Sequence, residues 1–122
     1  MNKIVITGNL TRDIELRQTE AGVSVCRFTV ACKRKFQPQE TDFVPVVAWK
    51  TTAEFVSRHF SKGAPMLIVG RLQMRTWEDA KGKHTAAEVV ADEIEFFSIV
   101  RKEDAPEKTQ PWVEVSGEGL PF

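Results

Sequence analysis

Hydrophobic and polar residues alternate along most of the chain, which is the pattern of β-strands with one buried face. The alternation is clearest over residues 23–35, where Cys26, Phe28, Val30 and Cys32 fall on one side and a more polar set falls on the other. We expect the first side to face a hydrophobic core. The same reasoning predicts further extended segments at residues 4–8, 14–18, 42–49, 66–77, 85–91 and 94–100.

Between two of these strands the apolar spacing changes to that of one short helix. The buried stripe of this helix is predicted to contain Ala53, Phe55, Val56 and Phe60. Thr51 and Glu54 are spaced as a capping box, in which a hydroxyl and a carboxylate each satisfy a free backbone amide at the helix start. Lys62 and Gly63 have the character of a helix end, and Pro65 prevents the helix from continuing.

The elements follow in the order of about three strands, a short helix and a strand hairpin. This order predicts an all-β protein, a five-stranded antiparallel Greek-key barrel of the OB-fold type with its helix between the third and fourth strands. An SH3-like barrel would lack a helix at that place, and a ferredoxin-like fold would need two longer helices. Prolines and charges then replace apolar residues. We therefore expect a folded domain at 1–103, a flexible linker at 104–116 and a C-terminal tip at 117–122.

The composition agrees with one small globular domain. Of the 122 residues, 42% are hydrophobic and 28% are charged, as in ordinary globular proteins. No apolar run approaches the roughly 20 residues that span a bilayer, and no signal-peptide core follows the opening Met1-Asn2-Lys3. We expect a cytoplasmic protein without membrane contact, in which Cys26 and Cys32 are reduced thiols rather than a disulfide.

The charges are balanced overall but unevenly distributed. The chain has 17 Lys and Arg residues against 17 Asp and Glu residues, and zero net charge by itself argues against nucleic-acid binding. Residues 1–103, however, carry 16 basic and 13 acidic residues, whereas residues 104–122 carry one basic and four acidic residues. The predicted barrel is therefore mildly basic, which restores nucleic acid as a candidate partner.

Signatures of the common enzyme classes are absent from the sequence. The chain has no GxxxxGK[ST] loop, no GxSxG elbow, no HExxH and no zinc-ligand quartet. Neither of its two histidines, His59 and His84, has a serine or cysteine placed as an obvious nucleophile. We expect no catalysis, no cofactor and no metal ion.

Basic residues interleave with aromatic residues on the predicted strands. Arg71, Gln73, Arg75 and Trp77 fall on one face of the segment 66–77. Further basic residues adjoin Phe36, Trp49 or the hairpin loop, namely Lys33, Arg34, Lys35, Lys50, Lys81 and Lys83. Single-stranded nucleic acid requires this combination, because cations neutralise its phosphates and flat rings stack on its bases. The alternative is that the rings belong to the core and that the run 33–35 is a solvated hairpin tip.

Several spaced motifs occur together over residues 1–100. They are NKIVITGNLTRD at 2–13, residues 43–50, FVSRHFSKG at 55–63, VGRL at 69–72, residues 75–83 and EVVA at 88–91. In these motifs the chain resembles the bacterial-type single-stranded DNA-binding proteins, cellular or phage-encoded. The final GLPF is similar to the Pro-Phe terminus of that family, although fewer acidic residues precede it here.

The resemblance implies non-catalytic, sequence-independent binding of single-stranded DNA in replication, recombination and repair. It implies base stacking on Phe36, Phe43, Trp49 and Trp77. Two of these are phenylalanines at places where the family often has tryptophan, which implies weaker binding per base. Together with the basic pattern, it predicts phosphate contacts from Lys33, Arg34, Lys35, Arg71, Arg75, Lys81 and Lys83.

The resemblance also implies a homotetramer and a C-terminal tip that docks replication and repair proteins. The docking residues would be Leu120, Pro121 and Phe122. Two other interpretations are left open by the residues themselves. One is a primosomal or RNA-directed OB-fold module, and the other is a small enzyme or a protein-interaction barrel.

Overall fold

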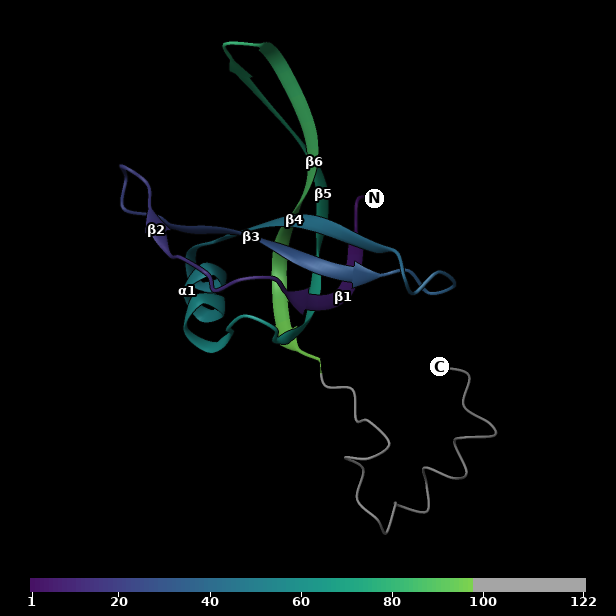
Figure 1. The fold of residues 1–122 in the computed structure, drawn as a ribbon. Coiled ribbons are helices and arrows are strands. Elements are labelled where there is room, and N and C mark those ends of the chain that lie inside the picture. Colours follow the sequence, from purple (N-terminus) through teal and green to yellow (C-terminus); the bar gives the residue numbers. More distant parts are fainter. Residues whose placement is uncertain (98–122) are drawn as a thin grey trace.

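The computed structural model describes residues 1–97, and these form a barrel of strands with one helix (Figure 1). The elements are β1 (Ile4–Leu10), β2 (Arg17–Gln18), β3 (Ser24–Lys33), β4 (Thr41–Trp49), α1 (Lys50–His59), β5 (Pro65–Asp79) and β6 (Gly82–Phe96). The strands form one sheet in the order β1-β5-β6-β4-β3-β2, and a further pairing between β1 and β3 closes it. With the two-residue β2 set aside, five long strands remain, and the helix follows the third of them, as predicted. The barrel is not antiparallel throughout, because β4 pairs with β6 in parallel.

The core lies on the side of β3 that the alternation predicts. Cys26, Phe28 and Val30 are buried, and Cys32 is half-buried. They pack with buried residues of the other long strands and of α1, among them Leu10, Val46, Val56, Met66, Ile68, Val89 and Ile94. Both cysteines are free thiols, and burial raises the pKa of Cys26 to about 11. The prediction that both cysteines lie in or near the core is confirmed.

Three details of α1 differ from the prediction. The N-cap residue is Trp49, and no side chain caps the helix. Glu54 instead accepts a hydrogen bond from the hydroxyl of Ser24 at 2.8 Å, so the predicted capping box is wrong and its carboxylate serves a tertiary contact. The helix also ends earlier than predicted, with Phe60 as its C-cap. Gly63 lies in the following turn at φ 90° and donates its N–H to the carbonyl of Leu10 at 2.8 Å.

The apolar stripe of α1 is confirmed at three positions and wrong at one. Ala53, Val56 and Phe60 are buried. Phe55 has 39% of its surface exposed, because it lies on the flank of the helix rather than toward the sheet. Helical spacing predicts which residues share a face, but the edge of that face depends on what packs against it.

The hairpin of β5 and β6 is longer than the sequence predicted. β5 continues to Asp79, and β6 joins the two predicted segments 85–91 and 94–100 into one strand up to Phe96. A register shift lies next to Gly70, where a Cβ atom would lie 2.1 Å from the carbonyl oxygen of Val90. Only glycine fits this close approach of two backbones.

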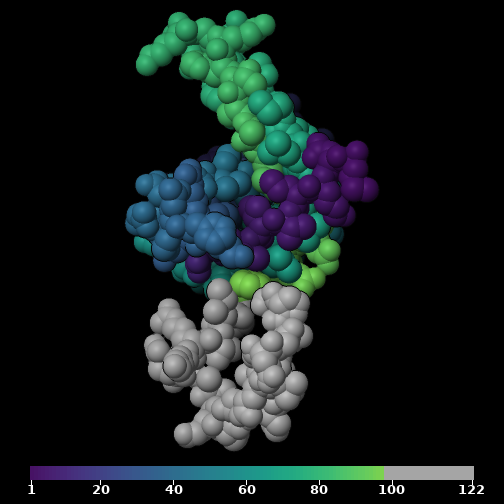
Figure 2. All heavy atoms as spheres, turned by 90° about the vertical axis from the view of Figure 1, so that its right-hand side faces the viewer, coloured from purple at the N-terminus to yellow at the C-terminus, as the bar shows by residue number. Residues whose placement is uncertain are grey.

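The outer part of this hairpin, residues 71–79 and 82–87, projects beyond the barrel and is called the arm below (Figure 1). Its residues are exposed or half-buried. Seen from the side, the arm stands clear of the body of the molecule (Figure 2). A two-residue loop between Asp79 and Gly82 closes it. The fold thus carries one strand pair away from the core, with both of its faces accessible.

Two further strand predictions concern the segment 14–18 and the position of Pro45. The predicted segment 14–18 pairs only at Arg17 and Gln18. Pro45 lies opposite Thr29 of β3, while the pairing of β4 with β6 begins at Val46. Pro45 therefore has a paired neighbour on one side only. That agrees with the predicted edge position, because proline has no N–H to give to a second neighbour.

Candidate nucleic-acid interface

One continuous surface of the sheet faces away from the core and is called the outer face below. Directly paired residues of neighbouring strands point to the same side, so the register defines this surface. Arg27 of β3 pairs with Val47 of β4, and Val47 pairs with Val90 of β6. Val90 pairs in turn with Arg71 of β5. The outer face comprises Val25, Arg27, Thr29, Phe43, Pro45, Val47, Trp49, Arg71, Gln73, Arg75, Trp77, His84, Glu88 and Val90.

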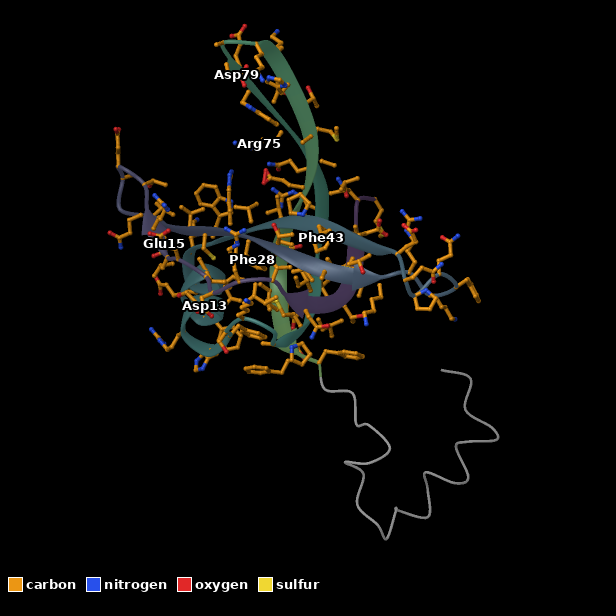
Figure 3. All side chains as sticks on the ribbon, in the orientation of Figure 1. Asp13, Glu15, Phe28, Phe43, Arg75 and Asp79 are labelled. Carbon is orange, nitrogen blue, oxygen red and sulfur yellow. The ribbon has the colours of Figure 1, made fainter. Side chains whose placement is uncertain are left out.

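Three of the four predicted stacking residues lie on the outer face, and all four are accessible. Phe43 has 65% of its surface exposed, Trp49 39% and Trp77 37%. Phe36 lies apart from them, in the loop between β3 and β4, with 87% exposed. Of the two readings that the sequence left open for these rings, the structure excludes burial in the core. Figure 3 shows Phe43 on the sheet and Arg75 on the arm above it.

On the arm, the ring of Trp77 lies against the side chains of Arg75 and His84. The guanidinium carbon of Arg75 lies 4.6 Å from the centre of the Trp77 ring. The ring of His84, directly opposite on β6, lies 5.3 Å away at an interplanar angle of 25°. The Oδ1 of Asp79, at the end of the arm, lies at hydrogen-bond distance, 2.9 Å, from the Nε2 of His84. The predicted alternation along β5 therefore does place Arg75 and Trp77 on one face, in contact.

The predicted phosphate-binding residues are exposed, but they are not equally free. Arg34 donates three hydrogen bonds to the carboxylate of Asp42, two from its Nε at 3.1 and 3.3 Å and one from its Nη2 at 3.0 Å. Their mutual hydrogen bonding raises the pKa of Arg34 and lowers the pKa of Asp42. The Nη1 of Arg71 lies 4.0 Å from the Oδ1 of Asp92, at the limit of an ion pair. The lysines of the prediction, Lys33, Lys35, Lys81 and Lys83, are exposed.

Two adjoining cavities form a groove along the outer face, and three further arginines line it. The first cavity is lined by Arg12, Arg27 and Arg75 together with residues that include Phe28, Pro45, Ala86 and Glu88. The second shares Arg12 and Arg27 and adds residues that include Arg17, Val25 and Trp49. Glu15 of the second cavity is ion-paired with Arg17 at 3.0 Å. The groove thus runs from Trp49 past Arg27 to Arg75 on the arm.

The sequence reasoning missed Arg12, Arg17 and Arg27 as candidate binding residues. Arg27 could have been found, since it falls on the polar side of the alternation over residues 23–35. Arg12 and Arg17 come from a stretch with little regular pairing, so no periodicity marks the direction of their side chains. Their place in the groove depends on the path of the chain between β1 and β3.

A second group of aromatic residues lies at the other end of the barrel and is called the helix-end cluster. It consists of Phe55 and His59 of α1, Phe60 at the C-cap of that helix, and Phe96 of β6. Phe60 stacks on Phe96 with ring centres 4.1 Å apart, and Phe55 contacts the rings of both His59 and Phe60. Phe55 and Phe96 are exposed. The sequence analysis did not single out this cluster as a surface.

Three further features of the sequence analysis concern metal sites, membrane-spanning helices and the C-terminal residues. Residues 1–97 contain no group of three or more side chains suited to hold a metal ion. Their one helix is too short and too polar to cross a membrane. The predicted linker 104–116 and the docking residues Leu120, Pro121 and Phe122 lie outside the described residues.

Comparison with known proteins identifies the family. The model of the single-strand binding protein family matches residues 1–97. The chain belongs to this family. Among curated single-strand binding relatives, the single-stranded DNA-binding protein of Caldanaerobacter subterraneus subsp. tengcongensis is 39% identical over 102 residues, which are 80% of this chain and 68% of that protein. Single-stranded DNA-binding protein 2 of Listeria monocytogenes is 43% identical over 102 residues, 80% of this chain and 64% of that protein.

A solved structure supports the same family and confirms the OB-fold. The crystal structure of a deletion mutant of the single-stranded DNA-binding protein from Thermus aquaticus matches with a TM-score of 0.69 and 30% identity. The match covers 88% of this chain and 44% of the other chain. The chain therefore spans less than half of that single-strand binding protein, and the shared part includes the barrel.

Proposed function

We propose that this protein binds single-stranded DNA, without catalysis and without sequence preference. The observation that carries the proposal is the outer face, where exposed rings share one surface with the guanidinium groups that line the groove. Bases can stack on Phe43, Trp49 and Trp77, whose rings are accessible, while Arg27 and Arg75 in the groove neutralise phosphates. Stacking is tolerant of sequence because every base has a flat π-face.

The arrangement favours a single strand over a duplex. In a duplex the bases are stacked on one another and cannot lie flat against Trp49 or Phe43. A single strand that follows the groove from Trp49 to Arg75 can present its bases to the sheet and its phosphates to Arg12, Arg17 and Arg27. Lys81 and Lys83 at the end of the arm would extend the cationic path. Phe36 is a stacking site only if the loop between β3 and β4 turns toward the strand.

The test is a titration of tryptophan fluorescence with oligo-dT at low salt. We expect quenching, because Trp49 in the groove and Trp77 on the arm are accessible, and a fall of affinity with rising salt. The variant Trp49→Phe with Trp77→Phe separates these signals from that of Trp112, which lies outside the described residues. Competition with duplex DNA and with an RNA of the same sequence ranks the strand types. Tighter binding of RNA than of DNA, or no quenching at all, would contradict the proposal.

We further propose that the protein acts in replication, recombination and repair as a homotetramer in the cytoplasm. Self-association is supported by β1, since Ile4–Gly8 pair with β5 on one edge while β3 meets β1 only at Asn9 and Leu10. A strand edge with free backbone groups favours pairing with another chain. Light scattering of the free protein and of its oligo-dT complex measures the assembly. A monomeric mass in both would contradict this part.

Recruitment of partner proteins is proposed for the C-terminal tip. The support is in the sequence, where Leu120, Pro121 and Phe122 end a stretch that is acidic overall. A terminal apolar side chain beside a carboxylate suits a pocket with a basic rim. Deletion of these three residues should leave the affinity for oligo-dT nearly unchanged and abolish binding of replication or repair enzymes. A large loss of DNA affinity would show that the tip belongs to the DNA site instead.

A further inference from the structure

Glu88 is an acidic residue where a DNA-binding surface should have none. It is the one charged residue among residues 1–97 that is buried, with 6% of its surface exposed. It lies on β6 opposite Gln73 of β5, at the base of the arm and on the outer face. A buried carboxylate has to be compensated by a nearby cation, because burial without one is costly.

The surroundings of Glu88 are the arginines of the proposed DNA groove. Glu88 lines the same cavity of about 340 Å³ as Arg12, Arg27 and Arg75. Its Oε1 lies 3.9 Å from the Nη2 of Arg27, whose side chain is half-exposed. That separation is an ion pair but is too long for a hydrogen bond. The carboxylate thus lies at the floor of the groove, with a guanidinium held loosely above it.

The guanidinium of Arg27 therefore lies between the fixed carboxylate of Glu88 and the open groove. When a phosphate arrives, the guanidinium can turn from the carboxylate to the phosphate, since it is not locked by a hydrogen bond. The carboxylate stays where it is, because β6 fixes its backbone in the middle of the sheet. Its negative charge then repels the same phosphate through a partly buried and poorly screened environment.

We propose that Glu88 limits the affinity and the salt dependence of DNA binding by competing with phosphate for Arg27. This inference rests on the proposed function. In the free protein Glu88 already neutralises part of the charge of Arg27, so Arg27 neutralises less of a phosphate's charge and fewer of the cations condensed on the DNA are released on binding. The competition weakens DNA binding and makes release easier, without removing a cation from the groove.

The test is the variant Glu88→Gln, which keeps the shape of the side chain and removes its charge. Binding of a labelled oligo-dT is measured by fluorescence anisotropy at several salt concentrations at pH 8. We expect the dissociation constant to fall about 3- to 10-fold, the size of effect that two unit charges about 4 Å apart have in a water-like dielectric. The slope of log K against log salt should steepen by up to about 0.7, the value for one more phosphate contact on a single strand.

The matched control is Glu95→Gln, which removes the same charge from the same strand. Glu95 is exposed and pairs with Leu67 at the opposite end of β6, outside the cavity. We expect less than about a twofold change, since exposed charges beyond the Debye length are screened. An equal gain in both variants would overturn the proposal, because net charge alone would then explain it. Unchanged or weaker binding by Glu88→Gln would overturn it as well.

The role of Arg27 is tested by the double variant. If Glu88 competes for Arg27, the steeper salt slope of Glu88→Gln should largely disappear when Arg27→Gln is also present, because no guanidinium is then released to contact a phosphate. A steepening that persists in full would overturn the exchange between carboxylate and phosphate. Circular dichroism and thermal melting verify that each variant is folded.

Should Glu88→Gln fail to fold, Arg27→Gln is compared with Arg75→Gln. The loss of affinity should be larger for Arg27→Gln, because that change also leaves Glu88 without its cation. An equal or smaller loss would overturn the proposal.

The proposed function and the inference about Glu88 would fail in different experiments. If the unaltered protein does not bind oligo-dT, the proposed function and this inference fall together. If it binds and Glu88→Gln does not tighten binding, only the inference about Glu88 falls.

Discussion

The outer face and the helix-end cluster both expose aromatic rings, yet they use them in different ways. On the outer face Phe43 and Trp49 lie at different positions along β4, and arginines line the groove beside Trp49. In the helix-end cluster the rings contact one another, with Phe60 stacked on Phe96 at 4.1 Å. Phe43 and Trp49 thus have no ring partner among residues 1–97, whereas Trp77 on the arm and the rings of the helix-end cluster already lie against a neighbour.

The difference shows that exposure alone does not identify a stacking site. Trp49 and Phe55 each have 39% of their surface exposed. A base can approach Trp49 from a groove that also holds Arg17 and Arg27, whereas Phe55 already lies against His59 at 4.8 Å and Phe60 at 6.0 Å. A free ring face next to a cation is the combination that single strands require. The following experiments would break or sharpen this contrast.

The largest effect is expected on stability, from the helix-end cluster. Phe60→Ala removes a buried ring that joins α1 to the end of β6, and such a change typically lowers the free energy of unfolding by about 3–5 kcal/mol. Denaturant unfolding followed by circular dichroism measures it. Oligo-dT affinity of the folded fraction should stay the same. A loss of stability below about 1 kcal/mol would show that this cluster is a surface feature rather than part of the core.

The next largest effect is expected on DNA affinity, from the outer face. Trp49→Ala should weaken oligo-dT binding about 5- to 150-fold, which corresponds to the 1–3 kcal/mol of one stacked base. Phe55→Ala is the matched control, because the two rings are equally exposed, and we expect it to change affinity less than about twofold. Anisotropy of a labelled oligonucleotide measures both. Similar losses in the two variants would remove the contrast between the regions.

A smaller effect is expected from charge. Arg75→Gln removes a guanidinium that lines the groove and contacts Trp77. The slope of log K against log salt should become shallower by about 0.7 for one lost phosphate contact. Arg58→Gln removes an exposed arginine from the last turn of α1, beside the helix-end cluster, and should leave the slope as it is. The pair of variants reports whether the cationic path follows the outer face.

The smallest effect is expected from Arg34, although it was among the predicted phosphate contacts. Its guanidinium is already engaged by Asp42, so Arg34→Gln should weaken binding less than about twofold, as for most exposed ion pairs. Lys35→Gln, at the next position in the chain, should weaken DNA binding more. Arg34 lowers the pKa of Asp42, so the pair is complete above the ordinary pKa of an aspartate. Its contribution is lost only as pH falls through the lowered value in the folded protein.

The unaltered protein and Arg34→Gln can therefore be compared across pH. From pH 8 down to pH 5 the difference between the unaltered protein and Arg34→Gln should stay constant, because Asp42 remains ionised over that range. Anisotropy titrations at each pH measure it. A difference that grows steadily between pH 8 and pH 5 would show that Arg34 is released for DNA by a group other than Asp42.

Local pattern predicted much of the fold and several residues of the interface. The alternation over 23–35 placed Cys26, Phe28 and Val30 in the core, and the alternation along β5 placed Arg75 and Trp77 on one face. These predictions hold because the direction of a side chain on a strand depends on its own backbone. The same local logic failed for the helix cap, since Glu54 found a partner in Ser24, 30 residues away.

What the sequence determined by itself is therefore the order of strands and helix, their buried sides, and the family to which the chain belongs. The tertiary structure decided which cations are free. Arg27 meets Glu88, from a strand far along the chain, and Arg34 meets Asp42 across a loop. It also decided that Phe55 is exposed and that Arg12 and Arg17 enter the groove. Alternation depends on neighbours in sequence, whereas ion pairing and ring exposure depend on strands that meet only when the barrel closes.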